Sequence, residues 1–260
     1  KCFIFFEITI PPKVIKTSGC NSEKSSSVSG NINLSIELIN FGWYKLEVVS
    51  VKTSTDSSSA KTEDSVLAGL YESSLRRSAD VSLATIDACR DAVASAVAQL
   101  VQTYRDGGTV FFCGNGGSAA DAQHLATEMM IRLGRDVKRP ALGAVSLATD
   151  TSNLTAGGND IGFDNVFARN IEGLGRSGDS LVAISTSGNS PNVLAAVQKA
   201  QALGLSTVAL TGGSGGQLRT TADVAIVIPS DDVQHIQETH ITVGHILCQA
   251  IEQTLYPING

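Results

Sequence analysis

The sequence predicts an α/β fold, a doubly wound sandwich in which helices flank a five-stranded parallel sheet. Two observations predict it. Five short apolar runs lie between residues 109 and 228, and segments with helical spacing separate them. Strands that are apolar along their whole length are buried on both faces, as parallel strands in such sandwiches are.

The elements follow in chain order. From 62 to 105, apolar side chains recur at spacings of three and four, which predicts one long helix or two consecutive ones, ended by Asp106-Gly107-Gly108. Pro191 and Pro257 suit the start of one later helix and the end of another. The predicted strands are 109–113, 142–147, 180–184, 206–210 and 224–228. The remaining predicted helices are 118–133, 150–174 with breaks at Gly157-Gly158 and Gly162, 191–203, 216–221 and 233–255.

Residues 1–60 differ in composition from the rest of the chain. They hold six Lys, no Arg and two Ser-rich tracts, whereas residues 61–260 are rich in Ala, Gly, Leu and Val. We therefore expect residues 1–60 to be a leader of unknown role, disordered or non-native, and residues 61–260 to be the functional domain. The Phe, Ile and Val content of the leader leaves one or two strands as the alternative.

Charge and apolar content argue against two classes of partner. The domain at 61–260 is mildly acidic and lacks the clustered Lys and Arg that neutralise nucleic-acid phosphates, so we expect no nucleic-acid partner. No run of about 18 apolar residues occurs, so we expect no membrane span. The five cysteines are odd in number and widely spaced without a CxxC, which predicts free thiols and a cytoplasmic protein.

Ligands bind such sheets beyond the carboxyl ends of the strands, which places several turns on one rim. The turn 185–190 holds four hydroxyl residues directly before a helix that starts at Pro191. Hydroxyls and the N–H groups of a helix amino end suit a phosphate dianion. The simpler interpretation, that Ser190 is only an N-cap, needs one hydroxyl and leaves the others unexplained.

The turn after the first strand, Gly114-Asn115-Gly116-Gly117-Ser118-Ala119, has two interpretations. Its GxGxxA pattern occurs in dinucleotide-binding proteins, but no acidic residue ends the second predicted strand to hold a ribose. A GxxxxGK[ST] motif is absent as well, which excludes a P-loop. We therefore interpret the turn as a cradle for a phosphorylated metabolite.

His124 and Glu128 are four residues apart on the next predicted helix, so they project from one face. That spacing offers an imidazole and a carboxylate to one metal ion or one substrate. An isolated pair of this kind is more often a surface pair. The last predicted helix favours the functional interpretation, because it carries the other three histidines, His235, His240 and His245, within eleven residues.

The spacing on the last helix leaves several choices open. Gln237 and His245 differ by about 80° around a helix, so both can face one side. Glu238 aligns slightly better with His245, so spacing alone does not decide which of Gln237 and Glu238 points at the site. His240 is either part of the site or a partly exposed helix residue, and we expect His235 at the surface.

These motifs closely resemble those of the sugar isomerase (SIS) domain family, specifically the phosphoheptose isomerases. The resemblance runs from about Asp64 to Pro257 and leaves out residues 1–60. It implies the SIS fold, a flavodoxin-like three-layer sandwich. The matching segments are CGNGGSAADAQHLATE at 113–128, GND at 158–160, ISTSGNSPNV at 184–193, ALTG at 209–212 and IQETHITVGHIL at 236–247.

Carried over residue by residue, the resemblance implies a complete site. The residues that contact the sugar phosphate are Asn115, Gly116, Gly117, Ser118, Asn159, Asp160 and Gln237. Those that hold its phosphate are Ser185, Thr186, Ser187 and Ser190. The ligands of a divalent metal, usually zinc in this family, are His124, Glu128, Gln237 and His245. Catalysis is assigned to Glu128 as the base and His245 as its acid or base partner.

The activity implied is the aldose–ketose isomerisation of sedoheptulose 7-phosphate to D-glycero-D-manno-heptose 7-phosphate through an enediol. The assembly implied is a homotetramer with active sites between subunits. The alternative within the family is a non-catalytic SIS-domain binding protein of the replication-initiator-associating type. That branch lacks the pair equivalent to Glu128 and His245, so the presence of both residues favours an enzyme.

Overall fold

The computed structural model describes residues 32–41, 44–53, 57–135 and 137–257. The chain divides into two compact units, Lys1–Leu67 and Ala68–Gly260. In the first unit, strands β1 (Ile32–Phe41) and β2 (Tyr44–Thr53) pair antiparallel. The alternative of strands within residues 1–60 therefore holds for this pair, and residues 1–31 of the expected leader lie outside the described residues.

The second unit is built around a five-stranded sheet, which confirms the predicted fold class. Its strands are β3 (Val110–Gly114), β4 (Ala144–Ser146), β5 (Ser180–Ile184), β6 (Ser206–Gly212) and β7 (Val224–Ile228). They lie in the order β4-β3-β5-β6-β7, and every neighbouring pair is parallel. The strand order reverses between β3 and β5, and this topological switch point is where such sheets bind ligands.

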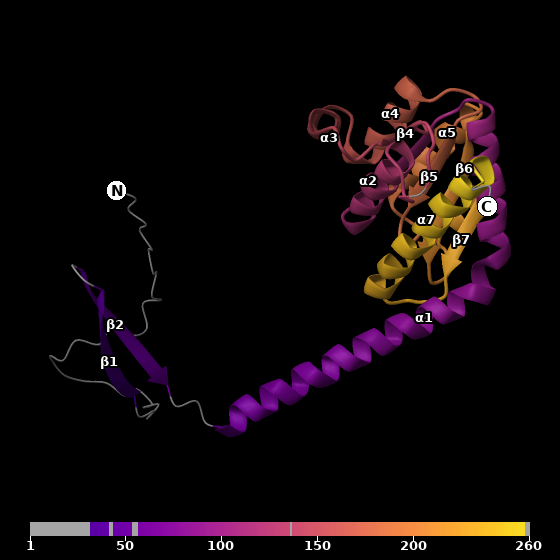
Figure 1. Ribbon diagram of the computed structural model, residues 1–260. Coiled ribbons are helices and arrows are strands. Elements are labelled where there is room, and N and C mark those ends of the chain that lie inside the picture. The colour runs from indigo at the N-terminus through magenta and orange to yellow at the C-terminus, as the bar shows by residue number, and fades with distance from the viewer. Residues whose placement is uncertain (1–31, 42–43, 54–56, 136, 258–260) are drawn as a thin grey trace, which may run out of the picture. The chain divides into compact units, whose positions relative to one another are not determined.

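Helices cover both faces of the sheet, so the unit has three layers (Figure 1). One face carries the later part of α1 (Ser57–Arg105), α2 (Gly117–Met130) and α7 (Val233–Leu255). The other carries α4 (Val166–Leu174), α5 (Pro191–Ala202) and the short α6 (Leu218–Thr221). None of the helices in the described ranges combines the length and hydropathy that crossing a bilayer requires.

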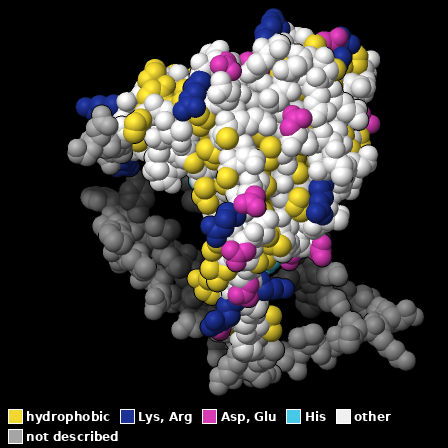
Figure 2. Space-filling model, turned by 90° about the vertical axis from the view of Figure 1, so that its right-hand side faces the viewer, with side chains coloured by type: hydrophobic (Ala, Val, Ile, Leu, Met, Phe, Trp, Pro, Cys, Tyr) yellow, Lys and Arg dark blue, Asp and Glu magenta, His cyan; other side chains and the backbone are white. Residues whose placement is uncertain are grey.

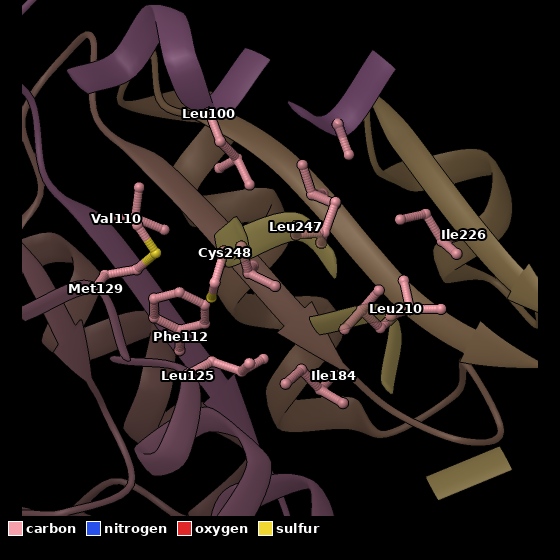
Figure 3. Packing of buried hydrophobic residues seen from close by; sticks show 14 of the residues in the cluster. Leu100, Val110, Phe112, Leu125, Met129, Ile184, Leu210, Ile226, Leu247 and Cys248 are labelled. Carbon is pink, nitrogen blue, oxygen red and sulfur yellow. The ribbon is translucent and has the colours of Figure 1, made fainter. Parts of the chain in front are cut away.

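The strands are apolar throughout because successive side chains enter different cores. In β3, Val110 and Phe112 belong to the core under α1, α2 and α7, whereas Phe111 and Cys113 belong to the core on the opposite face. Figure 3 shows Phe112 of the first core among side chains from α2, α7 and the neighbouring strands. Both faces are therefore dry, as the continuous apolar runs predicted.

Three predicted helix boundaries are wrong. The first is the start of α1, which lies at Ser57 rather than at residue 62. The helix α3 (Thr151–Asp160) runs through Gly157-Gly158, and its first turn is capped by the Asp150 carboxylate, which accepts from the Asn153 N–H at 3.0 Å. The break lies only at Gly162, whose φ of 81° is left-handed, and the short 3₁₀ turn η1 (Phe163–Asn165) and α4 follow it. A glycine costs a helix about 1 kcal/mol, which does not end a capped helix. Likewise α2 ends at Met130 rather than residue 133.

We expect Leu210→Ala to lower the free energy of unfolding by about 2–5 kcal/mol, because Leu210 lies in the middle of the sheet with 0% of its surface exposed. The matched substitution Leu174→Ala, at a side chain that is 52% exposed, should change it by less than about 0.5 kcal/mol. Urea denaturation followed by circular dichroism measures both values. Equal losses would contradict this description of the core.

Candidate active site

The turns that follow β3 and β5 are tied together across the switch point by two amides. Asn115 Nδ2 donates to Asn192 Oδ1 at 2.8 Å, and Asn192 Nδ2 donates to Asn115 Oδ1 at 2.9 Å. Asn192 is buried in the first turn of α5, and the sequence analysis missed it. The available signal was an amide side chain in the first helical turn directly after the hydroxyl segment.

The hydroxyl segment 185–190 leads into the amino end of α5. Ser185 Oγ and Ser190 Oγ share a hydrogen bond of 2.9 Å. Ser190 occupies the N-cap position, yet its side chain makes no capping hydrogen bond. The helix end therefore keeps uncapped N–H groups and the positive end of its dipole beside four hydroxyl residues, an arrangement that suits a phosphate. Thr186 and Ser187 also line a cavity of about 210 Å³.

The shape of this segment depends on Gly188, whose φ of 65° lies in the left-handed region. A side chain there would overlap the carbonyl group of Gly215, so only glycine fits. The turn after β6 supports the segment through backbone hydrogen bonds of 3.0 Å, from the Gly212 N–H to the Thr186 carbonyl and from the Leu218 N–H to the Gly188 carbonyl.

Helices α2 and α7 lie against each other and run in the same direction. Gly117 at the start of α2 faces the Gln237 side chain, and Leu125 faces Gly244 further along both helices. A Cβ atom at Gly117 would lie 2.6 Å from Gln237 Nε2, and one at Gly244 would lie 2.7 Å from Leu125 Cδ1. At both glycines a larger residue would displace the facing side chain, so the two positions let Gln237 and Leu125 lie close to the opposite helix.

This packing brings three predicted residues together. His124 Nε2 of α2 lies 2.7 Å from His245 Nε2 of α7 and 3.3 Å from Glu128 Oε1. One ligand atom from each residue lies within 4.8 Å of the others. Among His, Cys, Asp and Glu of the described ranges, these three form the only group arranged to bind a cation. Two imidazoles and a carboxylate are ordinary zinc ligands.

The structure also decides between Gln237 and Glu238. Gln237 is half-buried and faces α2, whereas Glu238 is exposed and accepts a hydrogen bond from His235 Nδ1 at 3.0 Å, which lowers the pKa of the Glu238 carboxyl. Eight residues of helix separate Gln237 from His245, about 12 Å along the axis. Gln237 thus lies beside the Gly-rich turn, and its role as a fourth metal ligand stays a prediction.

The two other histidines of α7 are both buried, so the expectation of a surface position for His235 is wrong. His235 is 4% exposed, and the carboxylates of Asp232 and Glu238 lie beside its two nitrogens, at 3.8 and 3.0 Å. His240 is 0% exposed, which excludes a partly exposed position for it. Its Nε2 donates to the Thr211 carbonyl at 3.1 Å, its Nδ1 has no hydrogen-bond partner, and burial lowers its pKa to about 4.

Asn159 and Asp160 lie elsewhere in the unit. They end α3, where both side chains are exposed and Asn159 Nδ2 donates to Asp160 Oδ1 at 2.7 Å. This helix packs on η1 and α4 and has no buried residue of its own. Contact of the two side chains with the substrate stays a prediction.

A comparison with known protein families shows to which family this three-layer sandwich belongs. The SIS domain family matches residues 75–212, which include both turns of the switch point and the helix that carries His124 and Glu128. The chain belongs to the SIS domain family.

Among the proteins that this chain resembles are several phosphoheptose isomerases. A phosphoheptose isomerase of Chlorobaculum parvum is 54% identical over 166 residues, which are 64% of this chain and 79% of that protein. That of Roseiflexus sp. is 46% identical over 182 residues, 70% of this chain and 91% of that protein. A solved phosphoheptose isomerase from Neisseria gonorrhoeae matches at 40% identity with a TM-score of 0.67, over 72% of this chain and 99% of that chain.

We expect His240 to make stability depend on pH. Its pKa is about 6.5 in the unfolded chain and about 4 in the folded one, so between these values only the unfolded chain binds the proton. Its contribution is therefore present above pH 6.5 and lost as the pH falls towards 4, by up to roughly 3 kcal/mol. The test compares the unfolding of wild type and His240→Gln in urea at pH 7.5 and 4.5. A difference between them that does not change with pH would contradict this prediction.

Proposed function

We propose that this chain is a phosphoheptose isomerase, which converts sedoheptulose 7-phosphate to D-glycero-D-manno-heptose 7-phosphate. The observation that carries the proposal is the meeting of Glu128 and His245 with His124, in a unit that also holds a hydroxyl-lined turn suited to a phosphate. The relatives named phosphoheptose isomerase, at about half identity, support the same reaction. The reaction is an aldose–ketose isomerisation that passes through an enediol.

Substrate binding begins at the phosphate. The hydroxyls of Ser185, Thr186, Ser187 and Ser190 and the amino end of α5 hold the dianion. The turn Asn115-Gly116-Gly117-Ser118 and the Gln237 amide beside it contact the sugar chain. The Asn115–Asn192 pair supports this division, because it fixes the sugar-binding turn to the first turn of the phosphate-binding helix.

Proton transfer is assigned to Glu128 and His245. The Glu128 carboxylate takes the proton from the carbon next to the ketone, which leaves an enediol. The proton returns to the former carbonyl carbon, and His245 moves a proton between the two oxygens, so the atoms balance and no electron acceptor is needed. Each such transfer contributes about 10²- to 10⁴-fold to the rate.

The donor set of the cluster also fits a divalent metal. His124, Glu128 and His245 would hold a zinc ion, with the Gln237 amide oxygen as the proposed fourth ligand. Bound zinc supplies positive charge that stabilises the negative oxygen of the enediolate. Glu128 has a second carboxylate oxygen and His245 a second ring nitrogen, so both residues would keep a group for proton transfer if they held the ion.

The alternative of a non-catalytic SIS-domain binding protein is not favoured. The Chlorobaculum parvum and Roseiflexus relatives, which match over 79% and 91% of their own length, are phosphoheptose isomerases, and the acid and base pair is present in this chain. The described cysteines, Cys89, Cys113 and Cys248, are free and buried, which supports the proposed cytoplasmic location.

We propose a homotetramer with active sites between subunits. Large apolar side chains of α1 and α7 support it, because Leu83, Ile86 and Ile246 are 65%, 53% and 48% exposed. Figure 2 shows hydrophobic side chains gathered on this face. Helices α1 and α7 line a groove of about 230 Å³ there, and contiguous apolar surface of this kind is typical of subunit contacts.

We expect Glu128→Gln to lower kcat by about 10²- to 10⁴-fold, because an amide cannot take the proton. The measurement is an NMR assay of sedoheptulose 7-phosphate incubated with the purified protein, in which the aldose 7-phosphate appears. Glu172→Gln, at a half-exposed carboxylate of α4, is the matched control and should retain full activity. Unimpaired turnover by Glu128→Gln with an unchanged circular dichroism spectrum would refute the assigned base.

We expect the wild type to have the mass of four chains in solution, and Leu83→Asp to shift it to smaller species, because a buried unpaired charge opposes association. Light scattering coupled to gel filtration measures both. Leu174→Asp introduces the same charge on α4, at a side chain of similar exposure, and should leave the mass unchanged. A monomeric wild type would contradict the proposed assembly.

A further inference from the structure

An ion pair that the sequence analysis did not single out is buried next to the proposed site. Arg139 Nε donates to Glu252 Oε1 at 2.7 Å, and the two side chains are 0% and 2% exposed. Removing two charges from water is costly, so a buried pair is weak evidence of added stability. Its remaining contacts indicate a different role.

Each of the three guanidinium nitrogens of Arg139 donates a hydrogen bond. Its Nη2 donates to the Glu128 carbonyl at 2.8 Å, and its Nη1 donates to the Pro140 carbonyl at 3.0 Å. The Glu128 carbonyl is one of the last four of α2, which have no partner within the helix and carry the negative end of its dipole. Arg139 therefore fixes the main chain of the residue proposed as the base.

Glu252 makes the corresponding contacts from α7. Its carboxylate accepts from the N–H groups of Leu133 and Gly134 at 3.1 and 3.2 Å, which holds the segment after α2 against α7. Burial acts to raise the pKa of Glu252, but the Leu133 amide, Arg139 and the Gly134 amide outweigh it and lower the pKa, so the carboxyl stays charged. His245 lies seven residues earlier, on the same side of α7.

The segment that Glu252 holds also borders His245. Leu133, Gly134, Arg135 and Val137 line a cavity of about 390 Å³ together with His245 and Glu252. The ion pair thus connects the end of α2, the wall of the space beside His245 and the end of α7.

We propose that Arg139 and Glu252 are positioning residues for the isomerase reaction, and that their ion pair sets the separation between Glu128 on α2 and His245 on α7. The inference rests on the roles proposed above for Glu128 and His245. Neither Arg139 nor Glu252 needs to touch the substrate. A misplacement of about 1 Å at the reacting groups can cost 10²-fold in rate, so a fixed separation of the two helices matters for catalysis.

The test uses two conservative variants of the full chain. Arg139→Lys keeps the charge but cannot donate to Glu252, Glu128 and Pro140 together, and Glu252→Gln keeps the shape but loses the charge. Ile171→Ala is the reference, because Ile171 is 0% exposed in the core on the opposite face of the sheet. The measurements are stability in urea, kcat and KM for sedoheptulose 7-phosphate, and zinc affinity by competition with a coloured chelator.

We expect both variants to lower kcat and zinc affinity by about 10- to 100-fold, as outer contacts of a metal site do. Their KM should change less than about threefold, because none of the hydrogen bonds of Arg139 and Glu252 goes to the phosphate segment 185–190. Ile171→Ala should lose stability and keep both kcat and zinc affinity.

If both variants keep kcat and zinc affinity within about threefold of wild type while unfolding more easily, the pair is only structural and the proposal is overturned. A wild type that does not turn over the sugar phosphate would contradict the proposed function instead, and the zinc affinities would then decide the positioning role. Should Glu252→Gln not fold, Arg139→Lys, which retains both charges, decides the question.

Discussion

The site depends on the adjacency of β3 and β5, which are parallel neighbours although β4 lies between them in the chain. The turn after β3 leads to α2 on one face of the sheet, and the turn after β5 leads to α5 on the other. The backbone amides and hydroxyls of both turns therefore lie at the carboxyl ends of these two strands, at the switch point. Helices on both faces keep these strands dry, and the apolar alternation between two cores holds their register. The Asn115–Asn192 amide pair then joins the two turns directly.

A second constraint is the close approach of α2 and α7. Gly117 faces the Gln237 side chain and Gly244 faces that of Leu125, and between the same two helices the Nε2 atoms of His124 and His245 lie 2.7 Å apart. Two imidazole nitrogens and a carboxylate oxygen at this separation all offer lone pairs, which is why a divalent cation suits the cluster. The buried Arg139–Glu252 pair joins the carboxyl end of α2, through the Glu128 carbonyl, to the last turn of α7.

The polar groups that join elements of this unit differ from those at the proposed phosphate site in how they are hydrogen-bonded. Buried groups that hold elements together are paired, as in the contacts of Glu252 with Arg139 and two backbone amides. By contrast, Ser190 stands at a helix start without capping it, and its hydroxyl shares a hydrogen bond with that of Ser185 instead. A helix end left uncapped is stabilised by an anion, so the sequence forgoes some local stability where a phosphate is to bind.

The sequence by itself determined the features that depend on neighbouring residues. Strand periodicity, the placement of His124 and Glu128 on one helix face, and the hydroxyl run before Pro191 are all local patterns, and the structure contains each of them. The family motifs added His245 to this set. Even a local prediction can be wrong: the sequence predicts a helix break at Gly157-Gly158, but α3 continues through both glycines because the Asp150 cap outweighs their helix-breaking tendency. Only the tertiary structure decided that Gln237 faces α2, that His235 and His240 are buried, and that Asn192, Arg139 and Glu252 have partners 77 and 113 residues away. The burial and the hydrogen-bond partners of these side chains depend on which helices pack together. The spacing of residues along the chain does not predict contacts between segments so far apart in the sequence.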